Sequence, residues 1–106
     1  MLLSDKLTIS VAGRSSPLSI AQIDEVLLEL HRFHPYVEFE CRYVQTLGDK
    51  DLTTSLRGME KTDFFTREID AMLLAGECRI AVHSAKDLPH HLPEGLSIAA
   101  ITYGLD

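Results

Sequence analysis

Charged and hydroxyl side chains follow two apolar stretches of this sequence, and their chemistry is that of an anion site beside a carboxylate. The two stretches are ISVAGRSSP (9–17) and RIAVHSAKDLP (79–89). The candidate site residues that follow them are Arg14, Ser15, Ser16, Ser84, Lys86 and Asp87. An Arg side chain offers a planar fork of N–H donors that matches a carboxylate ligand. We therefore predict an anion site at Arg14, next to Asp87 as an isolated carboxylate.

The elements that carry these side chains alternate between strands and helices. The pattern predicts strands at 6–12, 37–44, 79–83 and 96–102, and helices at 15–35 and 63–76. This order is typical of βαβ units, which give a three-layer α/β fold with a largely parallel or mixed sheet between helices. Because the carboxyl ends of parallel strands lie at one edge of a sheet, the two groups of candidate residues are expected to share that edge.

Local signals set the boundaries of several elements. Ser16 can cap the first helix, and Pro17 takes its first position, where a missing N–H does no harm. The strand at 37–44 alternates apolar and charged residues, which favours a strand near the edge of the sheet with one solvent-exposed face. For the second helix, Asp63 is the candidate N-cap, and Gly76 is expected to be the left-handed residue at its end. The polar stretch between these elements has no periodicity, so it is either a functional lid or a plain connection.

Composition limits the classes of function. The 106 residues make one domain, and 45% hydrophobic with 25% charged residues is ordinary for a soluble globular protein. A net charge of −6 argues against a nucleic-acid partner. Asp5 and Lys6 come too early for a signal peptide, and no apolar run is long enough to span a membrane, so we expect a cytoplasmic protein.

The cysteines and histidines do not form a pattern typical of a metal site. The two cysteines lack the spacing of a disulfide framework or of metal ligands. His83, His90 and His91 are close in sequence, but a metal needs convergent ligands. We favour a hydrogen-bonded structural role for His83 and a solvated turn for the other two histidines, and we expect no metal.

Four segments together resemble one enzyme family. They are GRSSPLSIAQ (13–22), TREIDAMLLAGECRIAVHS (66–84), HSAKDLP (83–89) and LPEGLSIAAI (92–101). Each is similar to a segment of the porphobilinogen deaminases, also called hydroxymethylbilane synthases, and they follow one another in the family's order. The resemblance implies that residues 1–106 are the first domain of a normally three-domain enzyme, with a fold like one lobe of a type II periplasmic binding protein.

The same resemblance implies a transferase of tetrapyrrole and heme biosynthesis. Such enzymes condense four porphobilinogen molecules into linear hydroxymethylbilane and release ammonia, with the polypyrrole growing on a dipyrromethane cofactor that is attached to a cysteine. Asp87 stands at the position of the family's catalytic carboxylate, which contacts pyrrole nitrogens. A fixed anion there stabilises the positive charge that develops on the ring as ammonia leaves. The residues implied to bind the acetate and propionate groups of substrate or cofactor are Arg14, Ser16, Ser84 and Lys86.

The chain departs from the family pattern in and near the lid loop. Within RGMEKTDFF, the positions of two usual lysines hold Gly58 and Thr62. Within TLGD, Leu47 replaces an arginine, whereas Asp49 is kept. Neither Cys41 nor Cys78 matches the cofactor cysteine, and both are expected to pack in the core. The attachment cysteine is therefore expected outside this chain, which alone should be inactive and carry no cofactor.

A second interpretation is a non-catalytic, anion-binding module related to the solute-binding lobes. Asp87 favours the enzyme, whereas the lost lysines favour the module. For the enzyme, the expected partners are porphobilinogen and the growing polypyrrole, with no nucleic acid and no membrane, and the full-length protein is expected to be a monomer. Because the family places a returning strand between residues 79–83 and 96–102, we expect this chain alone either to pair these segments directly or to recruit a second copy.

Overall fold

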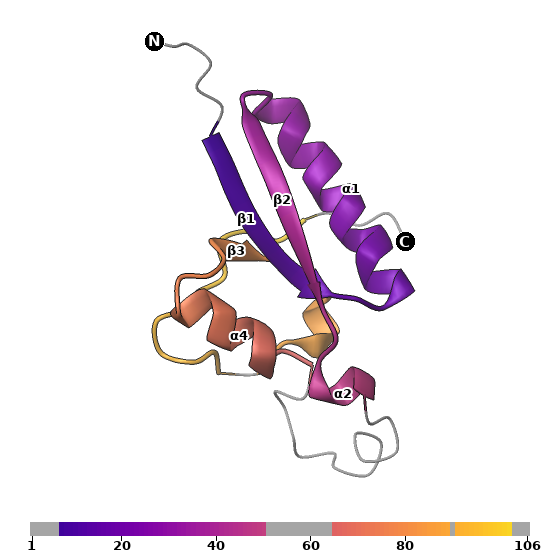
Figure 1. The fold of residues 1–106 in the computed structure, drawn as a ribbon, viewed down its shortest axis with the longest axis vertical. Coiled ribbons are helices and arrows are strands. Elements are labelled where there is room, and N and C mark those ends of the chain that lie inside the picture. Colours follow the sequence, from indigo (N-terminus) through magenta and orange to yellow (C-terminus); the bar gives the residue numbers. More distant parts are fainter. Residues whose placement is uncertain (1–6, 51–64, 90, 103–106) are drawn as a thin grey trace.

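The computed structural model describes residues 7–50, 65–89 and 91–102 as a parallel sheet with helices packed against it (Figure 1). Its elements are β1 (Leu7–Arg14), α1 (Pro17–Phe33), β2 (Val37–Val44), α2 (Leu47–Lys50), α4 (Arg67–Leu74), β3 (Ile80–Ala81) and the 3-10 helix η1 (Ala85–Asp87). The three strands run parallel in the order β2-β1-β3. The expected α/β class with a parallel sheet is confirmed.

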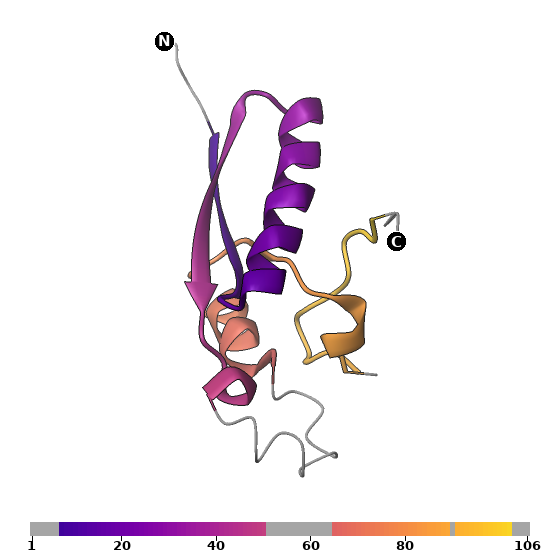
Figure 2. The same ribbon diagram turned by 90° about the vertical axis from the view of Figure 1, so that its right-hand side faces the viewer.

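The two longer helices cover opposite faces of the sheet. Gly13 of β1 faces α1, since a Cβ atom at this position would lie 2.2 Å from Cδ1 of the buried Ile23. The preceding residue, Ala12, packs in a buried cluster with Ile69 of α4. Because successive Cβ atoms of a strand point to opposite faces, α1 and α4 lie on different sides of β1. The result is the expected three-layer arrangement, and Figure 2 shows α1 as a separate layer on one side of β1 and β2.

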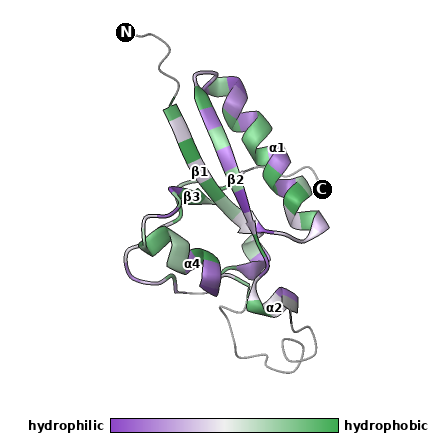
Figure 3. Cartoon of the chain, viewed as in Figure 1, coloured by the Kyte–Doolittle hydropathy of each residue, from purple (hydrophilic) through white to green (hydrophobic). Residues whose placement is uncertain are grey.

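β1 is the central strand, and it brings the site residues to one edge. It pairs with β2 over its full length, from Leu7 opposite Val37 to Arg14 opposite Val44. β2 is therefore an edge strand, and its alternating hydropathy is visible in Figure 3. Beyond β3, the Val82 N–H donates to the Ala12 carbonyl at 3.0 Å, which keeps the following residues beside the end of β1.

The predicted helix ends are partly correct. Ser16 is the N-cap of α1, and its Oγ accepts a hydrogen bond from the Ser19 N–H at 3.3 Å, as Pro17 begins the helix. α4 is shorter than expected, because it begins after Thr66; the proposed cap, Asp63, lies outside the described residues. Gly76 has φ +79°, so the left-handed conformation predicted after α4 is confirmed.

Two predicted strands need correction. The third strand is only Ile80–Ala81 rather than 79–83. Residues 96–102 form no strand, and Ile98 and Ile101 are 55% and 83% exposed. Direct pairing between these two segments is therefore wrong for this structure. An apolar run becomes a strand only where a neighbouring strand bonds its N–H and C=O groups, and no strand of the described ranges does so for 96–102, whose Leu96 N–H bonds only the nearby Pro93 carbonyl at 3.1 Å.

The polar stretch at 45–63 also differs from the expected loop. Its first part forms the short helix α2. The rest, including Gly58 and Thr62, lies outside the described residues.

Candidate functional site

Arg14, the last residue of β1, is the centre of an ion-pair cluster. Its Nη1 donates to Oδ2 of Asp87 at 2.8 Å. Its Nε and Nη2 donate to Oδ2 and Oδ1 of Asp49 at 3.2 and 2.5 Å. The three side chains are only 16%, 10% and 12% exposed, in the order Arg14, Asp87 and Asp49. One cation thus lies between two carboxylates at the carboxyl edge of the sheet.

This cluster confirms one expectation and corrects another. Arg14 and Asp87 do lie together, as the shared edge of a parallel sheet predicts. Asp87 is not isolated, however, because η1 turns its carboxylate onto the guanidinium of Arg14. Asp49, the second partner of Arg14, was not predicted. Its retention within TLGD was visible, but residues 35 positions apart carry no local signal of pairing.

The sequence TLGD (46–49) fixes Asp49 through a reciprocal cap of α2. The Thr46 N–H and Oγ1 donate to Oδ2 of Asp49 at 3.2 and 2.9 Å. The Asp49 N–H in turn donates to Oγ1 of Thr46 at 3.3 Å. From α4, Oε2 of Glu68 accepts from the Leu47 N–H at 2.8 Å. Such a capping box satisfies backbone donors that the first turn of a helix leaves free, so Asp49 is held in place from two sides.

The pairing changes the acid–base behaviour of both partners. Burial alone raises the pKa of Asp49, but hydrogen bonds from Arg14 and Thr46 lower it more, so the net pKa lies below its usual value. The pKa of Arg14 is raised, mainly by its hydrogen bond to Asp49 and against the effect of burial. Both groups are therefore charged at neutral pH.

The lowered pKa of Asp49 predicts a loss of stability in acid. The unfolded chain binds a proton at this carboxyl before the folded chain does, so Asp49 stabilises the fold above its usual pKa of 3.8. This contribution disappears as the pH falls through the folded-state pKa. Urea unfolding between about pH 6 and about pH 3 should show a steeper loss for the unchanged chain than for Asp49→Asn. The exposed Glu38→Gln is the control, and equal slopes for the unchanged chain and Asp49→Asn would contradict the prediction.

An aromatic ring completes the surroundings of Arg14. Its Cζ lies 4.2 Å from the centroid of the Phe65 ring, a distance typical of a cation–π contact. Gly48 makes room for this ring, since a Cβ atom there would lie 2.4 Å from Cε1 of Phe65. The guanidinium is thus fixed on its edge by carboxylates and on its face by an aromatic side chain.

Comparisons with known proteins identify the same family that the segments around Arg14 and Asp87 resemble. A family model described as "Porphobilinogen deaminase, dipyromethane cofactor binding domain" matches residues 9–106. This chain belongs to the porphobilinogen deaminase family. The porphobilinogen deaminase of Chloroherpeton thalassium is 41% identical over 97 residues, which cover 92% of this chain and 31% of that relative. Those of Synechococcus sp. (strain CC9311) and Prochlorococcus marinus (strain NATL1A) are 41% and 42% identical over 92 residues, or 87% of this chain and 29% of theirs. The chain thus spans about three-tenths of the length of these curated relatives.

Ser16, Ser84 and Lys86, the other candidate residues of this deaminase-family chain, differ in whether their side chains already have hydrogen-bond or ion-pair partners. Ser16 is engaged in capping, since its Oγ also donates to Oγ of Ser19 at 2.9 Å. Ser84 precedes η1 and makes no side-chain capping bond. Lys86 is exposed and has no ion-pair partner among the described residues. Ser84 and Lys86 are therefore the groups here that a ligand can reach without breaking a cap.

His83 does not make the hydrogen bonds that we expected. Both of its ring nitrogens are buried without a hydrogen-bond partner in the described part of the chain. Burial lowers its pKa; the negative charge of Asp87 raises it, and the positive charge of Arg14 lowers it further. His83 is therefore neutral at pH 7 and adds no charge to the cluster.

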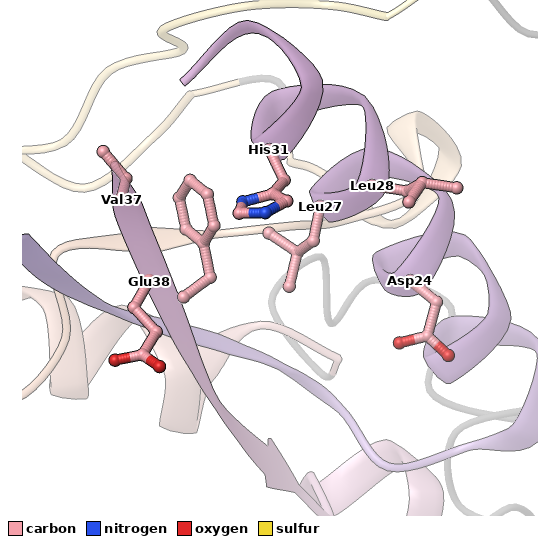
Figure 4. Close-up of a pocket in the computed structure, with 7 residues that line it drawn as sticks. Asp24, Leu27, Leu28, His31, Val37 and Glu38 are labelled. Carbon is pink, nitrogen blue, oxygen red and sulfur yellow. The ribbon is translucent and has the colours of Figure 1, made fainter. Parts of the chain in front are cut away.

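A shallow hollow between α1 and β2 is separate from this site (Figure 4). Its lining residues are Asp24, Leu27, Leu28, His31, Val37, Glu38 and Phe39. None of them belongs to the Arg14 cluster. Over the residues that the structure describes, which omit His90, no three His, Cys, Asp or Glu side chains are grouped to hold a metal ion. No helix in these ranges is both long and apolar enough to span a bilayer.

Proposed function

We propose that this chain is the first domain of a three-domain porphobilinogen deaminase, which condenses four porphobilinogen molecules into hydroxymethylbilane with release of ammonia in the cytoplasm. The observation that supports this most directly is the ion pair between Arg14 and Asp87. This ion pair brings together, at one edge of the sheet, two of the segments that resemble the family, 13–22 and 83–89. The length of the relatives supports a longer parent protein, and the parallel sheet is compatible with a lobe of the type II periplasmic binding protein fold.

In this proposal, Asp87 is the catalytic carboxylate. Its Oδ2 accepts from Arg14, which holds the side chain in one orientation and leaves Oδ1 for a pyrrole N–H. As ammonia leaves porphobilinogen, positive charge spreads over the ring to that N–H. A carboxylate fixed before the reaction stabilises this charge without having to reorient.

The donor groups near Asp87 fit a dipyrromethane cofactor, which carries carboxylates and pyrrole N–H groups. Lys86 is exposed and unpaired among the described residues, and the Ser84 hydroxyl makes no capping bond, so both can bind carboxylates. Arg14 would contribute through N–H donors that Asp49 and Asp87 do not use, whereas the Ser16 hydroxyl would have to exchange its bond to Ser19 for the ligand. When bound, the cofactor supplies the pyrrole on which the product chain grows.

We expect neither cysteine of this chain to carry the cofactor. Attachment needs a reactive thiolate, but burial is the main cause that raises the pKa of the Cys41 thiol, and Cys78 is 3% exposed in the core. After incubation of the 106-residue chain with porphobilinogen, intact-mass spectrometry should show the unmodified mass and no hydroxymethylbilane. A mass increase equal to two linked pyrroles would contradict this prediction.

We also expect the chain alone to self-associate. Residues 97–102 are mostly apolar, exposed and outside any strand pairing in the described structure, and such a segment recruits the backbone of another strand. The occupant we propose is the same segment, or β3, of a second copy. Size exclusion with light scattering should give a dimer or larger species, with slow amide exchange at 96–102. A monomer whose residues 96–102 exchange freely would rule this out.

The full-length parent decides between the enzyme and a non-catalytic anion-binding module. The enzyme should release ammonia and form hydroxymethylbilane from porphobilinogen. The module should bind porphobilinogen in calorimetry without consuming it. Binding without ammonia release, in a folded parent protein, would overturn the proposed function.

A further inference from the structure

Asp49 has no task in the proposed function, yet it makes more hydrogen bonds to Arg14 than Asp87 does. It accepts from two nitrogens of the guanidinium, whereas Asp87 accepts from one. Its own carboxylate is held by Thr46, whose side chain is fully buried. A surface charge with a mobile side chain would not be fixed in this way.

We propose that Asp49 is a positioning residue that neutralises Arg14 and thereby leaves Asp87 a free oxygen and an uncompensated negative charge. The inference rests on the proposed function only in taking Asp87 as the carboxylate that acts. One guanidinium carries one positive charge, and here it faces two carboxylates. Because Asp49 takes the two-nitrogen contact, which is the strong geometry for an Arg–carboxylate pair, Asp87 is left with the weaker single contact.

The surroundings of Arg14 keep this division of contacts in place. The Phe65 ring lies against the face of the guanidinium, and Gly48 lets the ring approach. The backbone on both sides of Arg14 is also fixed, since it pairs with Val44 and the Ser15 N–H donates to the Val44 carbonyl at 2.9 Å. If Asp49 loses its charge, no described contact of the same strength holds the guanidinium of Arg14 away from Asp87. Arg14 should then bind Asp87 through two nitrogens.

The test is an NMR measurement of the carboxyl carbons of Asp49 and Asp87 and of the Arg14 guanidinium nitrogens in the 106-residue chain and in Asp49→Asn. The quantity compared, at pH 7, is the hydrogen-bond coupling between the Arg14 guanidinium nitrogens and the carboxyl carbons. In Asp49→Asn, the Asp87 carboxyl carbon should couple to two Arg14 nitrogens instead of one, because Asp49 no longer binds the guanidinium. Asp49→Glu keeps the charge and should restore the single coupling. Glu38→Gln removes an exposed carboxylate of β2, away from the cluster, and should leave the single coupling unchanged.

A purely structural role for Asp49 predicts a different result. If Asp49→Asn only loosened the cluster, the Asp87 carboxyl carbon would keep its single coupling to Arg14 or lose it. Either result in a folded variant overturns the proposal.

If Asp49→Asn does not fold, the unchanged chain still gives the answer. The Arg14 Nε–H resonance should shift as Asp49 titrates, and a shift that follows only Asp87 would overturn the proposal. None of these measurements depends on turnover, so an inactive parent protein would defeat the proposed function without changing their outcome.

Discussion

Replacing Asp87 with Asn in the full-length parent should lower the turnover of porphobilinogen about 100- to 1,000-fold while the protein stays folded. The amide has nearly the same shape as the carboxylate, and it can still accept the hydrogen bond from Nη1 of Arg14. It carries no negative charge, however, so it cannot offset the charge that develops on the pyrrole as ammonia leaves. The loss should therefore appear in kcat rather than in stability. Ammonia release and hydroxymethylbilane formation are the measurements.

The matched control for Asp87→Asn is Glu38→Gln, which removes one charge from the exposed face of the edge strand β2. It should leave turnover within about twofold of the unchanged protein, since surface substitutions away from special features have small effects. Production of hydroxymethylbilane by Asp87→Asn at the rate of this control would remove Asp87 from the catalytic role.

Replacing Arg14 with Ala should lower the free energy of unfolding of this chain by about 3 kcal/mol at pH 7. Asp49 and Asp87 would remain charged and largely buried, 12% and 10% exposed, without their shared cation. Breaking a buried ion pair by removing one partner costs more than the pair contributes, because the remaining charge is left uncompensated. Two carboxylates lose their partner here. In the parent enzyme, the same change should also block cofactor assembly or chain elongation.

The destabilisation by Arg14→Ala should depend on pH. Carboxylates without their cation bind protons more readily, and a neutral carboxyl is cheaper to bury than a charged one. Urea unfolding should therefore show a smaller difference between the variant and the unchanged chain at about pH 4 than at about pH 7. Arg42→Ala, which removes an exposed cation of β2, should change stability by less than about 0.5 kcal/mol at either pH. A loss for Arg14→Ala no larger than for this control would contradict the prediction.

The sequence by itself determined the elements whose signals are local. Ser16 and Pro17 mark the start of α1 because a cap and a fixed φ act within one helical turn. The alternation of residues 37–44 predicted an edge strand because side chains of a strand alternate between its two faces. Gly76 takes φ +79°, as expected of a glycine after a helix. The order of strands and helices also placed Arg14 and Asp87 at the same edge of the sheet.

Only the tertiary structure decided which groups meet at that edge. The partner that binds Arg14 through two nitrogens is Asp49, and the helix that holds Asp49 is itself held by Glu68, which lies 21 residues away in the sequence from the backbone group it binds. Residues 96–102 have the composition of a strand but no strand neighbour among the described residues. The reason is the same in both cases. Caps and periodicity depend on neighbours three or four positions away, whereas ion pairs and strand pairing depend on where distant parts of the chain come together in space.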